Sequence, residues 1–218
     1  MALLEVCCSS IESALIAQKA GADRIEFCYD LSVGGITPDL EEILKLRQLL
    51  TIPLNVLVRP RAGNFVYSEE EFNIMLTTIS YLGTIACDGV VIGVLNNDTT
   101  IDTFRMKQLI DEARRCSLSV TFHRAIDETQ DIFKALEDVV SLNCDRILTS
   151  GGFVSAEKGS FVLKQLNRQA NERIIIMPGA GVSPENIKQI LEETGCVEIH
   201  GSFQGSEDKI KKARSLIS

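Results

Sequence analysis

An eightfold alternation of short apolar runs with longer amphipathic segments predicts an α/β fold, a (β/α)8 barrel of parallel strands of the triosephosphate isomerase (TIM) type. The 218 residues allow about 27 residues per unit, the length of a strand, a helix and two loops. The turn after the first apolar run reads Cys-Cys-Ser-Ser rather than a glycine-rich nucleotide fingerprint, which makes an open doubly wound sheet the less favoured alternative. No linker or low-complexity stretch divides the sequence, so residues 1–218 are expected to form one barrel domain.

The apolar runs that predict strands are residues 3–8, 24–28, 54–58, 89–94, 119–123, 146–150, 173–177 and 197–200. Helices are expected between them, and chemical start signals mark four of these helices. Two capping-box spacings and two cap-proline pairs supply these signals, at Ser9/Glu12, Ser68/Glu71, Thr37/Pro38 and Ser183/Pro184. In a barrel of this kind the functional groups lie at the carboxyl ends of the strands and in the loops that follow.

Composition excludes several classes of protein. Acidic residues outnumber basic ones by 30 to 22, and a formal net charge of −8 makes nucleic acid an unexpected partner. No apolar run approaches the roughly 20 residues of a membrane-spanning helix, and the N-terminus lacks the features of a secretory signal. Seven cysteines without a Cys-x-x-Cys spacing indicate free thiols in a reducing compartment. We therefore expect a cytoplasmic protein without a membrane partner and, because a dimer is the commonest closed assembly, a homo-oligomer.

Alternation along each barrel strand separates inward from outward side chains, because the apolar set must face the helices. In the first strand this rule leaves Glu5 and Cys7 inside, and in the second it leaves Glu26 and Cys28 inside. The same rule turns further polar side chains inward or toward the mouth, namely Asn55, Arg59, Ser119, Thr121, His123, Glu198, His200 and Ser202. The upper barrel is therefore expected to be polar.

Charges inside a barrel need a physical reason, since burying them is costly unless they pair or serve a site. One interpretation is a set of internal salt bridges, for example between Glu26 and Arg59. The other is a catalytic pocket for a small carboxylated or phosphorylated metabolite, with Glu5 and Glu26 as acid and base and Arg59 as an anion clamp. In that pocket His123 would assist proton transfer, and His200 is a second imidazole candidate.

Glycine-rich turns follow the sixth and seventh predicted strands. Their backbone amides are candidates for binding an anion, and the residues concerned are Ser150, Gly151, Gly152, Gly179 and Gly181. Arg61 is a further anion-binding candidate, because a rigid proline separates it from Arg59. The alternatives are that these glycines only form tight turns and that the arginine loop is solvated.

The cysteines divide by position. Four lie before predicted strands or at a helix end and are expected to serve packing: Cys87, Cys116, Cys144 and Cys196. Cys7 and Cys28 differ, because both face inward near the mouth on strands about 4.8 Å apart. Such a thiolate pair selects copper(I), whereas Cys8 should face the helices. Buried cysteines without any ligand are the alternative.

Seven short motifs occur in order along the chain: LEVC at 4–7, GADRIE at 21–26, GGxTP at 34–38, RPRxG at 59–63, TFHRA at 121–125, LTSG at 148–151 and PGAG at 178–181. With them the chain resembles the CutC family of copper homeostasis proteins, from the first strand to about Ser202. The resemblance implies a TIM-type barrel, a cytoplasmic location, oligomerisation and copper(I) ligands at Cys7 and Cys28. The chain departs from the family pattern after Phe203, where residues 204–208 bridge directly to the last helix.

Overall fold

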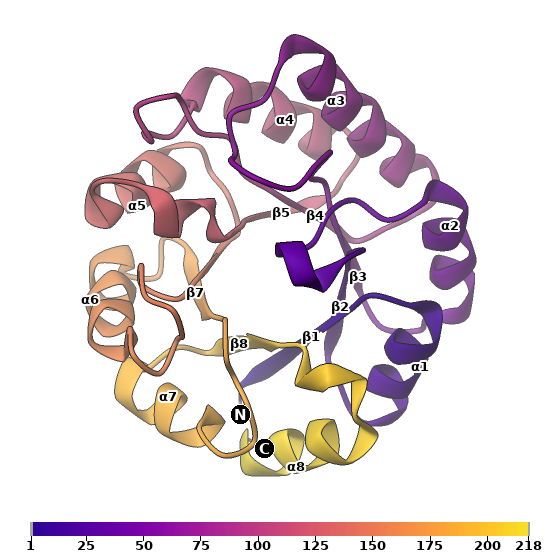
Figure 1. Ribbon diagram of the computed structural model, residues 1–218, viewed down its shortest axis with the longest axis vertical. Helices are drawn as coiled ribbons and strands as arrows, with labels where there is room; N and C mark the ends of the chain where they lie inside the picture. The colour runs from indigo at the N-terminus through magenta and orange to yellow at the C-terminus, as the bar shows by residue number, and fades with distance from the viewer. Residues whose placement is uncertain (1, 218) are drawn as a thin grey trace.

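The computed structural model describes residues 2–217 and contains the predicted barrel (Figure 1). All strand pairings are parallel, in the order β7-β6-β5-β4-β3-β2-β1-β8, and β7 lies beside β8, so that the barrel is nearly closed. The strands are β1 (Leu3–Cys8), β2 (Arg24–Phe27), β3 (Leu54–Leu57), β4 (Gly89–Ile92), β5 (Ser119–Phe122), β6 (Arg146–Thr149), β7 (Ile175–Pro178) and β8 (Glu198–Gly201). Met1 and Ser218, the ends of the predicted domain, lie outside the described residues.

A ring of helices surrounds the strands (Figure 1). They are α1 (Ile11–Lys19), α2 (Leu40–Leu49), α3 (Glu69–Thr84), α4 (Thr103–Arg115), α5 (Ile132–Ser141), α6 (Ser160–Ala170), α7 (Ile187–Thr194) and α8 (Glu207–Ile217). Short 3₁₀ segments follow β2, β5 and β8, at Leu31–Val33, Arg124–Glu128 and Phe203–Gly205. Within residues 2–217, none of the helices has both the length and the apolar character needed to cross a membrane.

The apolar core lies between the strands and the helices. Leu4, Val6, Ile25 and Phe27 belong to this core and are at most 1% exposed, as the alternation rule requires. The opposite parity faces the barrel interior, where a small separate apolar cluster contains Cys7 and Cys28 with Leu57 and Val91. The inward and outward assignment of the first two strands is therefore confirmed.

Two strands differ from the predicted bounds by two residues: β4 ends at Ile92 rather than at residue 94, and β7 begins at Ile175 rather than at residue 173. Arg173 still belongs to the turn after α6, because its amide donates to the carbonyl of Ala170 and its guanidinium pairs with Glu137. Because these bonds hold Arg173 in the turn, the strand begins later than the apolar pattern indicates.

Only one of the four predicted helix starts is confirmed. Ser68 caps α3, and Glu71 returns the bond to the Ser68 amide. The prediction at Ser9 and Glu12 was wrong by one residue, because Ser10 caps α1 and pairs with Ser13.

The two cap-proline predictions were also wrong. Helix α2 begins at Leu40 under an Asp39 cap, while the Thr37 hydroxyl accepts from the Arg59 amide instead. Helix α7 begins at Ile187, after the turn that contains Ser183. At α2 the carboxylate of Asp39 offers the first amides a better acceptor than Thr37 does, whereas the start of α7 has no side-chain cap.

Adjacent serines allow the capping assignment of α1 to be tested directly. We expect Ser10→Ala to lower the free energy of unfolding by about 1 kcal/mol, because it removes the acceptor for the Ser13 amide. Ser9→Ala should change it by less than about 0.5 kcal/mol, since Ser9 is exposed and lies outside the helix. Urea unfolding of both variants makes the comparison, and equal effects would contradict the assignment.

Candidate functional site

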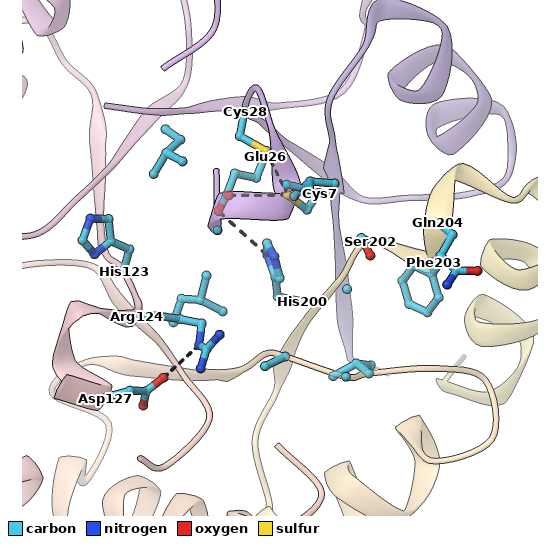
Figure 2. A pocket seen from close by; sticks show the side chains of 18 of the residues that line it. Cys7, Glu26, Cys28, His123, Arg124, Asp127, His200, Ser202, Phe203 and Gln204 are labelled. Carbon is cyan, nitrogen blue, oxygen red and sulfur yellow. Dashed lines mark hydrogen bonds and ion pairs between the residues drawn. The ribbon is translucent and has the colours of Figure 1, made fainter. Parts of the chain in front are cut away.

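A cavity of about 610 Å³ opens at the carboxyl ends of the strands (Figure 2). It is lined by both inward thiols and by four of the predicted charged or imidazole side chains: Cys7, Cys28, Glu26, Arg59, His123 and His200. The segment Leu31–Val33, purple in Figure 1, lies over this end of the barrel and supplies part of the lining. The short connection after β8 also forms part of the wall, through Ser202 and Phe203.

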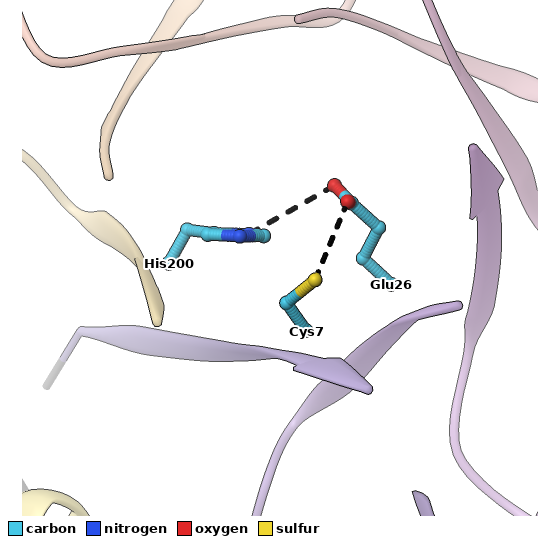
Figure 3. Close-up of side chains that lie close together, drawn as sticks. All are labelled: Cys7, Glu26 and His200. Carbon is cyan, nitrogen blue, oxygen red and sulfur yellow. Dashed lines mark hydrogen bonds and ion pairs between the residues drawn. The ribbon is translucent and has the colours of Figure 1, made fainter. Parts of the chain in front are cut away.

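Cys7, Cys28, Glu26 and His200 gather at one side of the cavity (Figure 2), and Figure 3 shows Cys7, Glu26 and His200 from close by. The sulfurs of Cys7 and Cys28 are 3.4 Å apart, and Sγ of Cys7 lies 3.7 Å from Oε1 of Glu26. Nδ1 of His200 lies 3.9 Å from Oε2 of Glu26. Strand pairing produces this group, because Cys7 of β1 stands opposite Glu26 of β2 and β8 flanks β1 on its other side. Cys7, Glu26 and His200 offer ligand atoms within 4.8 Å of one another, which is a geometry that could hold a metal ion.

The electrostatics of this group follow from its burial. The hydrogen bond with Cys28, burial and the charge of Glu26 raise the pKa of the Cys7 thiol well above its usual range. Burial raises the pKa of Glu26 to about 7, with a further contribution from Glu5 and opposition from His200. Oε2 of Glu26 is buried and has no hydrogen-bond partner among the described residues.

Glu5 lies beneath this group and is fully buried. It accepts hydrogen bonds from Nε of Arg24 at 2.5 Å and from Asn55 at 3.3 Å, and Nδ1 of His200 is 2.8 Å away. Burial alone would raise the pKa of Glu5, but the His200 bond and the Arg24 charge outweigh it and lower the pKa to about 2. This geometry assigns Glu5 to an ion-pair network rather than to acid–base chemistry in the cavity. Burial alone would lower the pKa of His200. The charges of Glu26 and Glu5 outweigh burial, so the pKa of His200 is raised.

Arg24 organises the network, and the sequence analysis missed it. Its Nη2 lies 2.5 Å from Oε2 of Glu198, which also accepts from Nε of Arg146 at 3.2 Å. The alternation rule contained the signal, because Arg24 stands two residues before the inward Glu26. Internal salt bridges therefore exist beneath the cavity, but the suggested pair of Glu26 with Arg59 was wrong.

Arg59 reaches the cavity wall but is committed to the backbone. It donates to the carbonyls of Val33 at 3.0 Å, Gly35 at 2.8 Å and Gly63 at 2.7 Å. Its guanidinium also lies over the ring of Phe65, 4.8 Å from the ring centroid. Arg59 therefore fastens the loops after β2 and β3 over the cavity.

Arg61 does not fill its predicted anion-binding role. It pairs with Glu71 at 2.6 Å and donates to the carbonyl of Val66 at 2.6 Å. The residue thus supports the loop that leads into α3, and its donors are used by this chain.

The amides predicted to hold an anion after β6 bind a carboxylate of the chain itself. Asp127 accepts from the amides of Ser150 at 3.1 Å and Gly152 at 3.0 Å, and from the Ser150 hydroxyl at 3.0 Å. The Gly151 amide donates to the hydroxyl of Thr149 at 2.9 Å. The turn has the predicted anion-binding character, but an internal side chain fills it, which corrects the prediction of an external ligand there.

The turn after β7 divides between two roles. The Gly179 amide donates to the carbonyl of Thr149 and helps to build the barrel. A Cβ at Gly179 would lie 2.4 Å from Cδ1 of Leu148, so a larger residue there would have to displace the Leu148 side chain. Gly181 lines the cavity, which leaves it as the anion candidate of this turn.

His123 lies apart from the thiols (Figure 2) and is held in one tautomer. Its Nδ1 accepts from the Ala125 amide at 3.2 Å, so the proton of the neutral ring is on Nε2, which has no partner among the described residues. Burial lowers the pKa of His123 to about 3, and the charge of Arg59 adds to the effect. His123 therefore offers a neutral N–H donor at physiological pH.

The low pKa of His123 predicts a pH dependence of stability. Between about pH 6.5 and 3 the unfolded chain binds a proton at this residue that the folded chain does not, so this contribution to stability is lost as the pH falls. Between about pH 6.5 and 3 we expect the free energy of unfolding of His123→Asn to fall by a few kcal/mol less than that of the wild type, because asparagine does not titrate. Urea unfolding of both proteins at several pH values measures the difference, and parallel curves would contradict it.

Comparisons with known proteins agree with the motifs. The model of the CutC family matches residues 2–205. A family protein CutC of Xylella fastidiosa is 46% identical over 199 residues, which cover 91% of this chain and 74% of that protein. A family protein CutC of Bacteroides fragilis is 45% identical over 205 residues, which cover 94% and 81%.

Solved structures give the same result. CutC from Streptococcus agalactiae superposes with a TM-score of 0.87 at 35% identity and covers 93% of this chain and 99% of that one. Phosphoribosylanthranilate isomerase from Thermotoga maritima has a TM-score of 0.64 at 14% identity, covering 100% and 98%, which is a likeness of fold alone. The family match over nearly the whole chain, together with relatives above 40% identity, shows that this chain belongs to the CutC family.

Proposed function

We propose that this protein serves in copper homeostasis and binds copper(I) through Cys7 and Cys28. The observation that carries the proposal is the 3.4 Å separation of the two sulfurs at the wall of the cavity. The similar structure from Streptococcus agalactiae is named for copper homeostasis, which supports the same role.

The donor set suits a soft ion. Thiolates select copper(I), whereas a set of one thiolate, one imidazole and one carboxylate is also typical of zinc. The two facing thiols favour copper(I), whereas the harder set of Cys7, Glu26 and His200 would favour zinc. Binding requires the Cys7 thiol to lose its proton, and its hydrogen bond to Glu26 sets a carboxyl group beside that proton.

A competition titration tests the proposal. The reduced protein is titrated anaerobically with copper(I) in the presence of a chromophoric chelator, and in parallel with zinc(II). We expect one equivalent of copper(I) to be withdrawn from the chelator. Tight zinc binding without copper(I) binding would overturn the proposal in favour of the Cys7, Glu26 and His200 set.

We also propose that the protein is cytoplasmic and forms a homo-oligomer, with a dimer favoured. All seven cysteines are free, as expected for a reducing compartment. Sedimentation equilibrium of the reduced protein tests the oligomer, and a monomer at micromolar concentration would overturn it.

A second candidate function is catalysis on a small carboxylated or phosphorylated metabolite. The cavity of about 610 Å³ favours it, because a single metal ion fills only a small part of such a volume. Glu26 and His200 line the cavity as the proposed acid and base, and His123 lines it as the proposed hydrogen-bond donor. Mass spectrometry of small molecules released from the purified protein tests this candidate, for which we expect an organic acid.

A further inference from the structure

Much of the cavity has no part in copper binding. Both thiols belong to one wall, whereas His123 lies apart from them (Figure 2). A volume of about 610 Å³ is within the roughly 300–1,000 Å³ of sites for small organic molecules. Apolar side chains supply much of the remaining lining, among them Leu31, Leu57 and Val182. A ligand that fills this space therefore has a carbon skeleton.

His123 supplies a donor that the chain does not use. The side chain lines the cavity and is 5% exposed, and its Nε2 has no partner within residues 2–217. The bond from the Ala125 amide to Nδ1 fixes the proton on Nε2. A buried donor without an acceptor is unfavourable unless a ligand satisfies it.

Arg59 supplies a charge that no carboxylate of the described chain neutralises. Its side chain is buried at 5% exposure, its two terminal nitrogens donate to carbonyl groups, and its other polar neighbour is the uncharged hydroxyl of Tyr67. Arg59 lies over Phe65, and the Phe65 ring centroid is 4.8 Å from that of His123. Phe65 is thus a neighbour of both other side chains, all three line the cavity, and we call them together the Arg59 wall. A buried cation without a counter-ion favours an anion close by.

We propose that the Arg59 wall binds a small organic acid, with its carboxylate or phosphate oxygens toward the Arg59 charge and the Nε2–H of His123. The carbon skeleton lies along Phe65 and the apolar lining. Lys209 also lines the cavity, whereas the charge of Arg124 is paired with Asp127 at 2.9 Å, so Arg59 remains the buried lining cation without a carboxylate partner among the described residues. The proposal rests on the second candidate function and names its ligand class and subsite.

The proposal is tested by titrating the metal-free protein with pyruvate and, separately, with inorganic phosphate. In protein labelled with 15N-histidine, we expect a saturable shift of the His123 Nε2–H signal with at least one of them. A response to pyruvate alone identifies a carboxylate subsite, and a response to phosphate identifies a phosphate subsite. No saturable response to either probe would overturn the proposal.

Two substitutions separate binding from folding. His123→Asn retains an acceptor for the Ala125 amide but lacks the Nε2 donor. Its affinity for the probe, measured by calorimetry, should be about tenfold to a hundredfold lower than that of the wild type. His123→Gln returns an amide donor near the position of Nε2 and should restore part of the affinity. Unchanged affinity in His123→Asn would contradict the assignment.

The copper and organic-acid proposals fail independently. The Cys7→Ser/Cys28→Ser variant leaves the Arg59 wall intact and should bind the probe as the wild type does. Loss of copper(I) with retained probe binding supports both sites, whereas loss of probe binding in this variant would contradict a separate subsite.

Discussion

The Cys7→Ser/Cys28→Ser variant is expected to lose its affinity for copper(I) by more than about a hundredfold, since even changes in the groups around metal ligands cost about 10- to 100-fold. The two sulfurs are 3.4 Å apart, and serine hydroxyls are hard donors that copper(I) does not favour. Competition with a chromophoric copper(I) chelator gives the affinity.

The other cysteines provide matched controls. Cys8 packs in the apolar core between strands and helices, and Cys87 and Cys144 belong to the same core. Cys8→Ser and Cys87→Ser/Cys144→Ser should therefore retain the wild-type copper(I) affinity. An equal loss in these variants would mean that the affinity depends on general stability rather than on the inward thiols.

Glu5→Gln is expected to lower the free energy of unfolding by about 3–5 kcal/mol at neutral pH, because it leaves Arg24 with one buried carboxylate partner where it had two. The pKa of Glu5 is about 2 in the folded chain, whereas a glutamate that makes no such interactions has a pKa of about 4.5. The contribution of the ionised carboxylate is therefore complete above about pH 4.5 and is lost as the pH falls toward 2. The difference between variant and wild type should shrink over that range in urea unfolding experiments.

Glu207→Gln is the control for this effect. Glu207 pairs with Lys211 at the surface, where the Lys211 side chain is 54% exposed. Surface pairs contribute about 0–1 kcal/mol, so this variant should stay close to the wild type. If Glu5→Gln is no less stable than Glu207→Gln, the ion-pair network beneath the cavity does not contribute the predicted free energy of unfolding.

The parts of this structure that follow from local periodicity could be predicted from the sequence. The eightfold alternation of apolar runs with amphipathic segments predicted the barrel. The two-residue period of side-chain direction along a strand predicted that Glu5, Cys7, Glu26 and Cys28 point inward. The family followed from motifs in order along the chain, and the comparisons confirm it.

The choice of partners inside the barrel could not be predicted in the same way. Glu5 bonds to Arg24 rather than serving as an acid, and Asp127 fills the turn at Ser150 and Gly152. These pairings depend on the stagger between strands and on loop paths, which the pattern of one strand does not determine. Arg24 shows the same limit, because its place beneath Glu26 gains meaning only once Glu198 of β8 is known to lie within reach.

Copper K-edge X-ray absorption of the protein loaded with one equivalent of copper(I) tests the thiol site most directly. We expect sulfur to dominate the neighbours of the metal in the wild type and to be lost from them in Cys7→Ser/Cys28→Ser. Copper surrounded only by nitrogen and oxygen in the wild type, or an unchanged sulfur shell in the variant, would contradict the proposed site.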